Sequence, residues 1–215
     1  MSFLLGGLTR YCSPEQLNRL QAARVGIAGA GGLGSNAAFL LARSGVRRLT
    51  IADRDVVEPS NLNRQAYFPE HVGMPKVEAL SQELLRLDPT LEINAFYAEI
   101  TTNFVFKYFS DCSAVVEALD GAEDKAMLCR TLAGSGIFLV CASGIAGLSG
   151  PPMHSRRIGD NTLVVGDGVT SIAAAPPMGP RVMQAAAMQA EAVLKFILGK
   201  DGEPEAPTLN QQRKF

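Results

Sequence analysis

The stretch RVGIAGAGGLGSNAAFLLARSGVRRLTIAD, residues 24–53, decides the fold. Its first six residues (24–29) predict a short buried strand that enters a glycine cluster, and a helix of about 33–44 follows. A second strand is predicted at 46–53. This order of strand, glycine loop, helix and strand is typical of parallel α/β sheets that bind nucleotides at the loop.

The glycine loop, GAGGLG (29–34), has four glycines with separate tasks. Gly29 permits the tight turn, and Gly34 lets the helix pack closely on the sheet. Gly31 and Gly32 let the backbone approach a ligand. The free N–H groups at the start of the helix can then hold phosphate oxygens.

An acidic residue, Asp53, ends the second strand, 19 residues after Gly34. A carboxylate at this place can accept hydrogen bonds from ribose hydroxyls, so the loop and Asp53 together predict nucleotide binding. The alternative is that the glycines serve turn geometry alone and that Asp53 pairs with Arg54 or Arg47. The loop and Asp53 do not distinguish NAD from ATP.

Helices and strands continue to alternate along the chain, which predicts a Rossmann-like α/β fold: a parallel-majority sheet with helices on both faces. A C-terminal β excursion follows, and a final helix. The remaining predicted helices are 14–22 (with Ser13 as N-cap), 72–88, 102–109, 123–133 and 181–198; the remaining strands are 91–100, 113–119, 136–143 and a hairpin at 154–167.

The chain divides into three predicted parts. Residues 1–23 form an N-terminal helical segment, residues 24–200 a single domain, and residues 201–215 a polar, flexible tail.

Composition excludes several classes of protein. Lys and Arg number 20 against 21 Asp and Glu, a net charge of −1, which argues against a general nucleic-acid binder. No stretch approaches 18 uninterrupted apolar residues, and the first 16 residues lack the basic flank and long apolar region of a signal peptide. We therefore expect a soluble, cytoplasmic protein with no membrane or nucleic-acid partner.

The four cysteines contain no CxxC pair, which excludes a cysteine-rich zinc knuckle. Cys112, Cys129 and Cys141 lie on or beside apolar elements, and we expect them to be ordinary core residues. Cys12 lies outside the predicted core and is left as a candidate for sulfur chemistry.

Three charged residues follow successive strands at the edge where such sheets bind ligands. Arg64 lies in a polar loop, PSNLNRQ (59–65), and Lys76 opens the next helix, so both can face a triphosphate. Asp120 follows a buried strand and can hold a magnesium ion between phosphates. Alternatively, Arg64 is a surface salt-bridge partner, Lys76 a solvated helix residue and Asp120 a helix N-cap.

The segments GAGGLGSNAAFLLARSGVRRLTIADRD, SNLNRQ, GMPKVEAL and ALDGAEDK, spread over residues 24–147, resemble the ThiF/MoeB/HesA family, bacterial relatives of ubiquitin-activating enzymes. The later segment GDGVTSIAAAPPMGPRV resembles a short, zinc-free branch of ThiF-type sulfur-carrier adenylyltransferases, associated with thiamin thiazole biosynthesis. The resemblance implies that residues 24–200 form an ATP-binding adenylation domain. It also implies that the domain uses ATP and Mg²⁺ to adenylate the C-terminal glycine carboxylate of a small β-grasp, ThiS-like carrier, with release of pyrophosphate.

By the same resemblance, Asp53 holds the ribose, Arg64 and Lys76 hold the phosphates, and Asp120 holds the metal. These three charged residues, Arg64, Lys76 and Asp120, are therefore the expected catalytic group. The nucleotide contacts that the resemblance implies are Gly32, Asp53, Ser60, Asn61, Leu62, Asn63, Arg64, Lys76, Asp120 and Gly121.

The chain also departs from the family pattern. Ser13 stands where family members often have a second arginine that reaches into the neighbouring subunit's ATP site. Arg10 and Arg19 are the two candidates to take over this role. The resemblance implies a homodimer and a possible sulfur-donor protein, and the missing CxxC pairs predict no structural zinc. Because residues 144–180 contain no cysteine, we do not expect in-chain persulfide or thioester chemistry.

Three alternative functions stay open. A relative of this family can act on a different carboxylate, such as one on tRNA, although the near-neutral charge argues against that. An NAD-dependent Rossmann oxidoreductase would use the same glycine loop and Asp53, but it leaves Arg64, Lys76 and Asp120 unexplained. The third alternative is a binding or scaffold role without catalysis.

Overall fold

The computed structural model describes residues 2–199, which form a seven-stranded sheet in the order β3-β2-β1-β4-β5-β7-β6. Every neighbouring pair is parallel except β6 and β7 at the edge. The strands are β1 (Arg24–Ala28), β2 (Arg48–Asp53), β3 (Glu92–Tyr97), β4 (Ala114–Glu117), β5 (Phe138–Ala142), β6 (His154–Ile158) and β7 (Thr162–Gly166). The predicted Rossmann-like α/β fold with a C-terminal β excursion is therefore confirmed.

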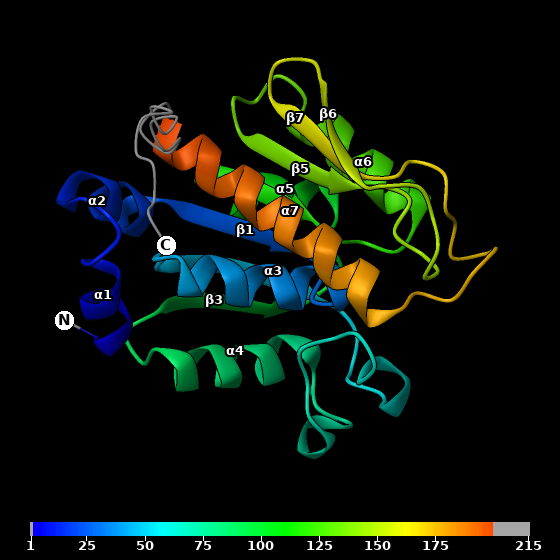
Figure 1. Ribbon diagram of the computed structural model, residues 1–215, viewed down its shortest axis with the longest axis horizontal. Coiled ribbons are helices and arrows are strands. Elements are labelled where there is room, and N and C mark those ends of the chain that lie inside the picture. Colours follow the sequence, from blue (N-terminus) through cyan, green and yellow to red (C-terminus); the bar gives the residue numbers. More distant parts are fainter. Residues whose placement is uncertain (1, 200–215) are drawn as a thin grey trace, which may run out of the picture.

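Helices cover both faces of the sheet (Figure 1). The helices are α1 (Phe3–Leu8), α2 (Pro14–Ala22), α3 (Gly32–Arg43), α4 (Lys76–Leu87), α5 (Thr102–Tyr108), α6 (Ala122–Leu132) and α7 (Gly179–Leu198), with short 3-10 turns η1 (Pro59–Asn61) and η2 (Pro69–His71). One apolar core joins α2, α3, α4 and α7 to one face, and a second core joins α5 and α6 to the other. In Figure 1, α7 crosses the molecule beside α3.

The alternation of side chains along the central strands explains the two cores. On β1, Val25 and Ile27 belong to the first core, while Ala28 belongs to the second. On β4, Val116 belongs to the first core and Val115 to the second. Because both faces are covered, these strands carry apolar residues at almost every position, which is the pattern of a buried parallel strand.

Several predicted boundaries need correction. Helix α4 begins at Lys76 rather than near residue 72, because Gly73 has a φ of +90° and Pro75 occupies the N-cap. The helix α1 was not predicted; the Ser2 side chain accepts a hydrogen bond from the Leu5 N–H and donates one to Asp88. Two predicted parts lie outside the described residues: the tail, residues 201–215, and residue 200, the last of the predicted domain.

The predicted start of α2 is confirmed in detail. The Ser13 hydroxyl accepts from the Gln16 N–H at 3.2 Å, and the Gln16 side chain accepts from the Ser13 N–H at 2.9 Å, which is a capping box. We expect Ser13→Ala to lower the free energy of unfolding by about 1 kcal/mol, measured by urea denaturation. Ser13→Asp should keep most of the stability because aspartate also caps; equal losses in both variants would contradict the capping role.

Candidate nucleotide site

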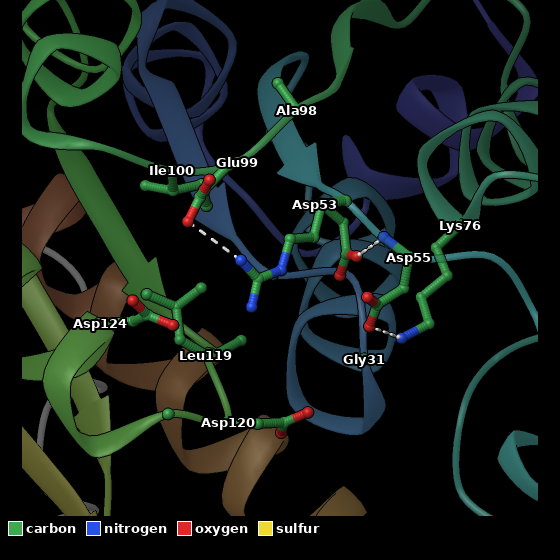
Figure 2. Close-up of a pocket in the computed structure, with 14 residues that line it drawn as sticks. Gly31, Asp53, Asp55, Lys76, Ala98, Glu99, Ile100, Leu119, Asp120 and Asp124 are labelled. Carbon is green, nitrogen blue, oxygen red and sulfur yellow. Dashed lines mark hydrogen bonds and ion pairs between the residues drawn. The ribbon is translucent and has the colours of Figure 1, made fainter.

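The carboxyl ends of β1, β2 and β4 meet around a cavity of about 110 Å³ (Figure 2). The glycine loop contributes Gly29 and Gly31, the end of β2 contributes Asp53, and the segment after β4 contributes Asp120. Residues that the sequence singled out at separate strand ends therefore lie around one space, as expected for the carboxyl edge of a parallel sheet.

Each glycine of the loop has different structural surroundings. Gly29 has a φ of +99°, and a Cβ there would lie 2.5 Å from the Ala118 carbonyl oxygen. A Cβ on Gly34 would overlap the Gly29 carbonyl, so Gly34 serves the packing of α3 on the loop. At Gly31, by contrast, the nearest atom to an added Cβ is 3.9 Å away, and this residue faces open space where a ligand can approach.

Gly32 has a second role that the sequence did not predict. A Cβ on Gly32 would lie 2.7 Å from Val182 Cγ1, so this glycine also permits close packing of α3 against α7. It lines a larger cavity that adjoins the first one.

Asp53 fixes the glycine loop to the end of β2. Its carboxylate accepts hydrogen bonds from the Ala30 N–H at 2.6 Å and the Asp55 N–H at 2.7 Å, and it lines the cavity. Burial raises the pKa of this carboxyl, against the lowering effect of the two backbone hydrogen bonds. The alternative pairing is wrong, because Arg54 pairs with Glu99 at 3.0 Å and Arg47 with Asp88.

Lys76 is a buried cation rather than a solvated helix residue. Only 5 % of it is exposed, and its Nζ lies 2.7 Å from a carboxylate oxygen of Asp55, as Figure 2 shows. The Tyr67 hydroxyl donates to the Ala30 carbonyl at 2.6 Å and lies 3.3 Å from the Lys76 carbonyl, which joins the start of α4 to the glycine loop. The structure thus places an ammonium group beside the loop, where it can contact a phosphate.

Whereas Lys76 lines the smaller cavity, Arg64 lies in the wall of the larger one. Its Nη1 donates to the Ser60 carbonyl at 3.0 Å and to Asn63 Oδ1 at 2.9 Å. Within residues 2–199 it makes no ion pair, so the salt-bridge alternative has no support there. Its guanidinium keeps donors for an anionic ligand.

Asp120 is exposed and lines both cavities. It is not the N-cap of α6, because that position belongs to Gly121, which also lines the smaller cavity. A second carboxylate, Asp124 in the first turn of α6, faces the same cavity (Figure 2). Sequence reasoning missed Asp124 although it lies only one helical turn after Asp120.

Four residues of the polar loop shape it without lining either cavity. The Asn61 side chain accepts from the Glu58 N–H at 3.1 Å, and Leu62 packs on the core. A Cβ on Gly179 would lie 2.9 Å from the Asn63 carbonyl, so this loop and the start of α7 are in close contact. The predicted nucleotide contacts that do not line either cavity are Gly34, Ser60, Asn61, Leu62 and Asn63.

The larger cavity, of about 1070 Å³, adjoins the first along Gly31, Leu119 and Asp120. Gln65 lines it, is 7 % exposed, and has a side-chain carbonyl oxygen without a hydrogen-bond partner. Glu117 is fully buried in its wall, with Lys125 Nζ 2.9 Å away. None of Gln65, Glu117 and Lys125 was predicted as a site residue, although Gln65 ends the quoted polar loop.

The segment after β7, which also lines the larger cavity, is held by a buried ion pair. Asp167 accepts from Arg181 Nη2 at 2.5 Å, from the Val169 N–H at 2.7 Å and from the Thr170 N–H at 2.8 Å. Val169 and Thr170 then contribute to the cavity wall. An ion pair between Asp167, just after β7, and α7 thus positions a segment in which the sequence predicted no site residue.

The model of the ThiF family matches residues 7–215. This chain belongs to the ThiF family. Among curated relatives, it is 32 % identical over 203 residues to the sulfur carrier protein ThiS adenylyltransferase of Bacillus subtilis, covering 89 % of this chain and 59 % of that protein. It is 31 % identical over 148 residues to the tRNA threonylcarbamoyladenosine dehydratase of Escherichia coli, covering 68 % of this chain and 55 % of that protein. This ThiF-family chain spans only about half the length of the curated relatives it matches.

Solved structures agree on the fold. The Escherichia coli tRNA N6-threonylcarbamoyladenosine dehydratase has a TM-score of 0.83 at 23 % identity, covering 92 % of this chain and 95 % of that one. The Escherichia coli MccB complex with ATP has a TM-score of 0.69 at 21 % identity, covering 90 % of this chain and 63 % of that one. In this ThiF-family chain, no helix of the described part is long and apolar enough to cross a membrane, and no cluster of three or more potential metal ligands occurs there.

Proposed function

We propose that this protein is an adenylyltransferase that binds ATP beside the glycine loop and adenylates the C-terminal glycine carboxylate of a small β-grasp sulfur carrier. The observation that carries the proposal is the junction of the two cavities at Gly31 and Asp120. A nucleotide in the smaller cavity would present its phosphates at this junction. An extended carrier tail could then enter through the larger cavity and bring its carboxylate to the same point.

The reaction needs alignment and charge neutralisation more than it needs a protein nucleophile. The carrier carboxylate attacks the α-phosphorus of ATP, the bond to the β-phosphate oxygen breaks, and pyrophosphate leaves with that bond's electrons. Lys76, Arg64 and the N-terminus of α3 are cationic or electropositive groups around the junction, and they would oppose the repulsion between the anions. Their fixed positions would also limit the entropy lost on reaching the transition state.

The residues at the junction fit a magnesium–nucleotide complex. Mg²⁺ in such sites is bound by one or two carboxylates together with substrate phosphates, so a preformed cage of protein ligands is not required. Asp120 would hold the ion, with Asp124 on the same cavity wall. The ion would neutralise phosphate charge and stabilise the leaving pyrophosphate.

A second candidate substrate is a carboxylate on tRNA. The similarity to the tRNA threonylcarbamoyladenosine dehydratase, which extends over 95 % of that solved chain, favours it. The formal charge of −1 favours the protein carrier, because nucleic-acid affinity depends on neutralising many phosphates. Membership in the ThiF family leaves the oxidoreductase alternative without support.

The remaining family features stay proposals. We expect a homodimer, a sulfur-donor protein and a role in thiamin thiazole biosynthesis, and we expect no structural zinc. Arg19 donates to the Leu198 carbonyl at 2.8 Å within its own chain. Arg10, which is exposed, is therefore the better candidate to reach a neighbouring ATP site.

Exchange of radiolabelled pyrophosphate into ATP tests the proposed substrate class. The protein would be assayed with a ThiS-like carrier, with the same carrier lacking its terminal glycine, and with tRNA bearing threonylcarbamoyladenosine. We expect exchange only with the intact carrier. Exchange with the tRNA alone would replace the carrier by the second candidate, and no exchange with any substrate would overturn the adenylation proposal.

Asp53→Ala should act mainly on nucleotide affinity, because ribose contacts are similar in the ground and transition states. Loss of hydrogen bonds to a charged group is worth about 1.5–3 kcal/mol, so the Kd for ATP should rise about 10- to 100-fold. Titration calorimetry measures this, with the exposed Glu70→Ala as control. A large fall in the exchange rate at saturating ATP, with Kd unchanged, would contradict the assignment.

A further inference from the structure

Two cysteines from different elements meet in the wall of the larger cavity. Cys129 on α6 and Cys141 on β5 have their sulfur atoms 3.6 Å apart, and both residues line that cavity. The proposed adenylation uses neither of them. They are therefore a pair of nucleophilic groups that the proposed function leaves unexplained. Cys129 packs against the second core, as predicted, but it also lines the cavity.

The two thiols are not equivalent in access. Cys129 is half-buried and can be reached from the cavity, whereas Cys141 is 7 % exposed on a central strand. Because Cys129 is the more exposed of the two, we expect a reagent in the cavity to react with it first, with the Cys141 sulfur 3.6 Å away. This order is what a two-step thiol reaction requires, with one sulfur attacking and the other resolving.

The surroundings favour the thiolate on Cys129. The Cys141 thiol as donor holds the pKa of Cys129 below its usual value, and the positive charges of Lys125 and Arg130 act in the same direction. Burial and the negative charge of Glu117 raise the pKa of Cys129 and so oppose this shift. Lys125 Nζ also pairs with Glu117 at 2.9 Å. The pKa of Cys141 is raised, so this thiol keeps its proton until Cys129 has reacted.

We propose that Cys129 and Cys141 form a reversible dithiol–disulfide site that reacts with low-molecular-weight disulfides such as oxidised glutathione. In the first step the Cys129 thiolate attacks one sulfur of the reagent, a mixed disulfide forms, and one thiolate of the reagent leaves. In the second step Cys141 loses its proton and attacks Cys129 Sγ, which expels the second thiol. Two protein thiols are oxidised and one reagent disulfide is reduced to two thiols.

The other two cysteines lack this arrangement. Cys112 is buried in the same core as Cys141 but makes no sulfur–sulfur contact among the described residues, and its pKa is raised to about 12, mainly by burial. Cys12 is half-buried near the N-terminus. Among residues 2–199, the Cys129–Cys141 contact is the only pairing of sulfur atoms, so the reaction should be confined to it.

The test treats the full chain with oxidised glutathione and maps its peptides by mass spectrometry before and after reduction. The wild-type protein should lose two free thiols, give a peptide linked through Cys129 and Cys141, and retain no glutathione. Dithiothreitol should restore both thiols. Cys12→Ser serves as the control variant and should give the same linked peptide.

Single substitutions separate the attacking and the resolving thiol. Cys141→Ser should trap glutathione on Cys129, whereas Cys129→Ser should leave Cys141 unmodified. Circular dichroism checks that both variants fold. If Cys141→Ser does not fold, Cys141→Ala takes its place. A stable glutathione adduct on wild-type Cys129 without the linked peptide would overturn the proposal. Modification confined to Cys12 would overturn it as well.

Discussion

Asp120→Ala should lower carrier-dependent pyrophosphate exchange by about 10²–10³-fold, the usual effect of removing one preorganised charge from a reaction centre. Asp120 lines both cavities at their junction, so its carboxylate is placed where the phosphates of ATP would react. Lys76→Ala and Arg64→Ala should each cause a loss of similar size. Exchange rates at saturating ATP and carrier measure all three effects.

The melting temperature of each variant distinguishes a loss of catalysis from a loss of folding. Asp120 is exposed, so the melting temperature of Asp120→Ala should fall only slightly, as surface changes are usually worth under about 0.5 kcal/mol. Glu123→Ala is the matched control, because Glu123 is an exposed carboxylate three residues after Asp120, in the first turn of α6, and lines neither cavity. Full exchange activity in Asp120→Ala, or an equal loss in Glu123→Ala, would show that the site is assigned wrongly.

The largest effect on stability is expected from Asp167→Ala. The substitution leaves the buried guanidinium of Arg181, which is 8 % exposed, without its carboxylate. Breaking a buried pair by removing one partner costs about 3–5 kcal/mol. Urea denaturation should show this loss, and exchange activity should fall with it because Val169 and Thr170 lose the carboxylate that positions them.

The matched control for Asp167→Ala is an exposed ion pair on α7, the helix that carries Arg181. In this pair, Lys195 Nζ lies 2.8 Å from a carboxylate oxygen of Glu191. Glu191→Ala should cost less than about 0.5 kcal/mol. Equal losses in the two variants would contradict the role of burial at Asp167.

Acidification should weaken the same ion pair. Burial would raise the pKa of Asp167, but hydrogen bonds from Thr170 and Val169 and the charge of Arg181 outweigh it and lower the pKa in the folded state. The stabilisation is therefore complete above the pKa of the unfolded chain, about 3.9, and is lost as the pH falls below it towards the folded-state pKa.

Local patterns predicted most of the fold, since β1, β2, β4 and β5 are short, mostly buried runs and the edge strand β3 alternates in sequence. The N-cap at Ser13 and the hairpin of β6 and β7 depend on neighbouring residues alone, and both were predicted. The start of α4 was placed too early, because periodicity extends through Gly73 and Pro75 although their backbone conformations are not helical.

The site was harder to predict where it depends on tertiary contacts. Asp53, Lys76 and Asp120 were found because each follows a strand or opens a helix. The partner of Lys76, Asp55, and the packing of Gly32 against Val182 depend on how the elements are arranged in space. The same holds for Cys129 and Cys141, which are 12 residues apart in sequence yet have their sulfur atoms in contact across α6 and β5.

The most direct test of the account is the intact mass of a ThiS-like carrier after incubation with this protein, ATP and Mg²⁺. Adenylation predicts a carrier heavier by one adenylyl group, with the addition on its C-terminal glycine. Hydroxylamine should remove the group, because it attacks an acyl-adenylate, and Asp120→Ala should form little of the product. An unmodified carrier in the presence of bound ATP would contradict the central claim.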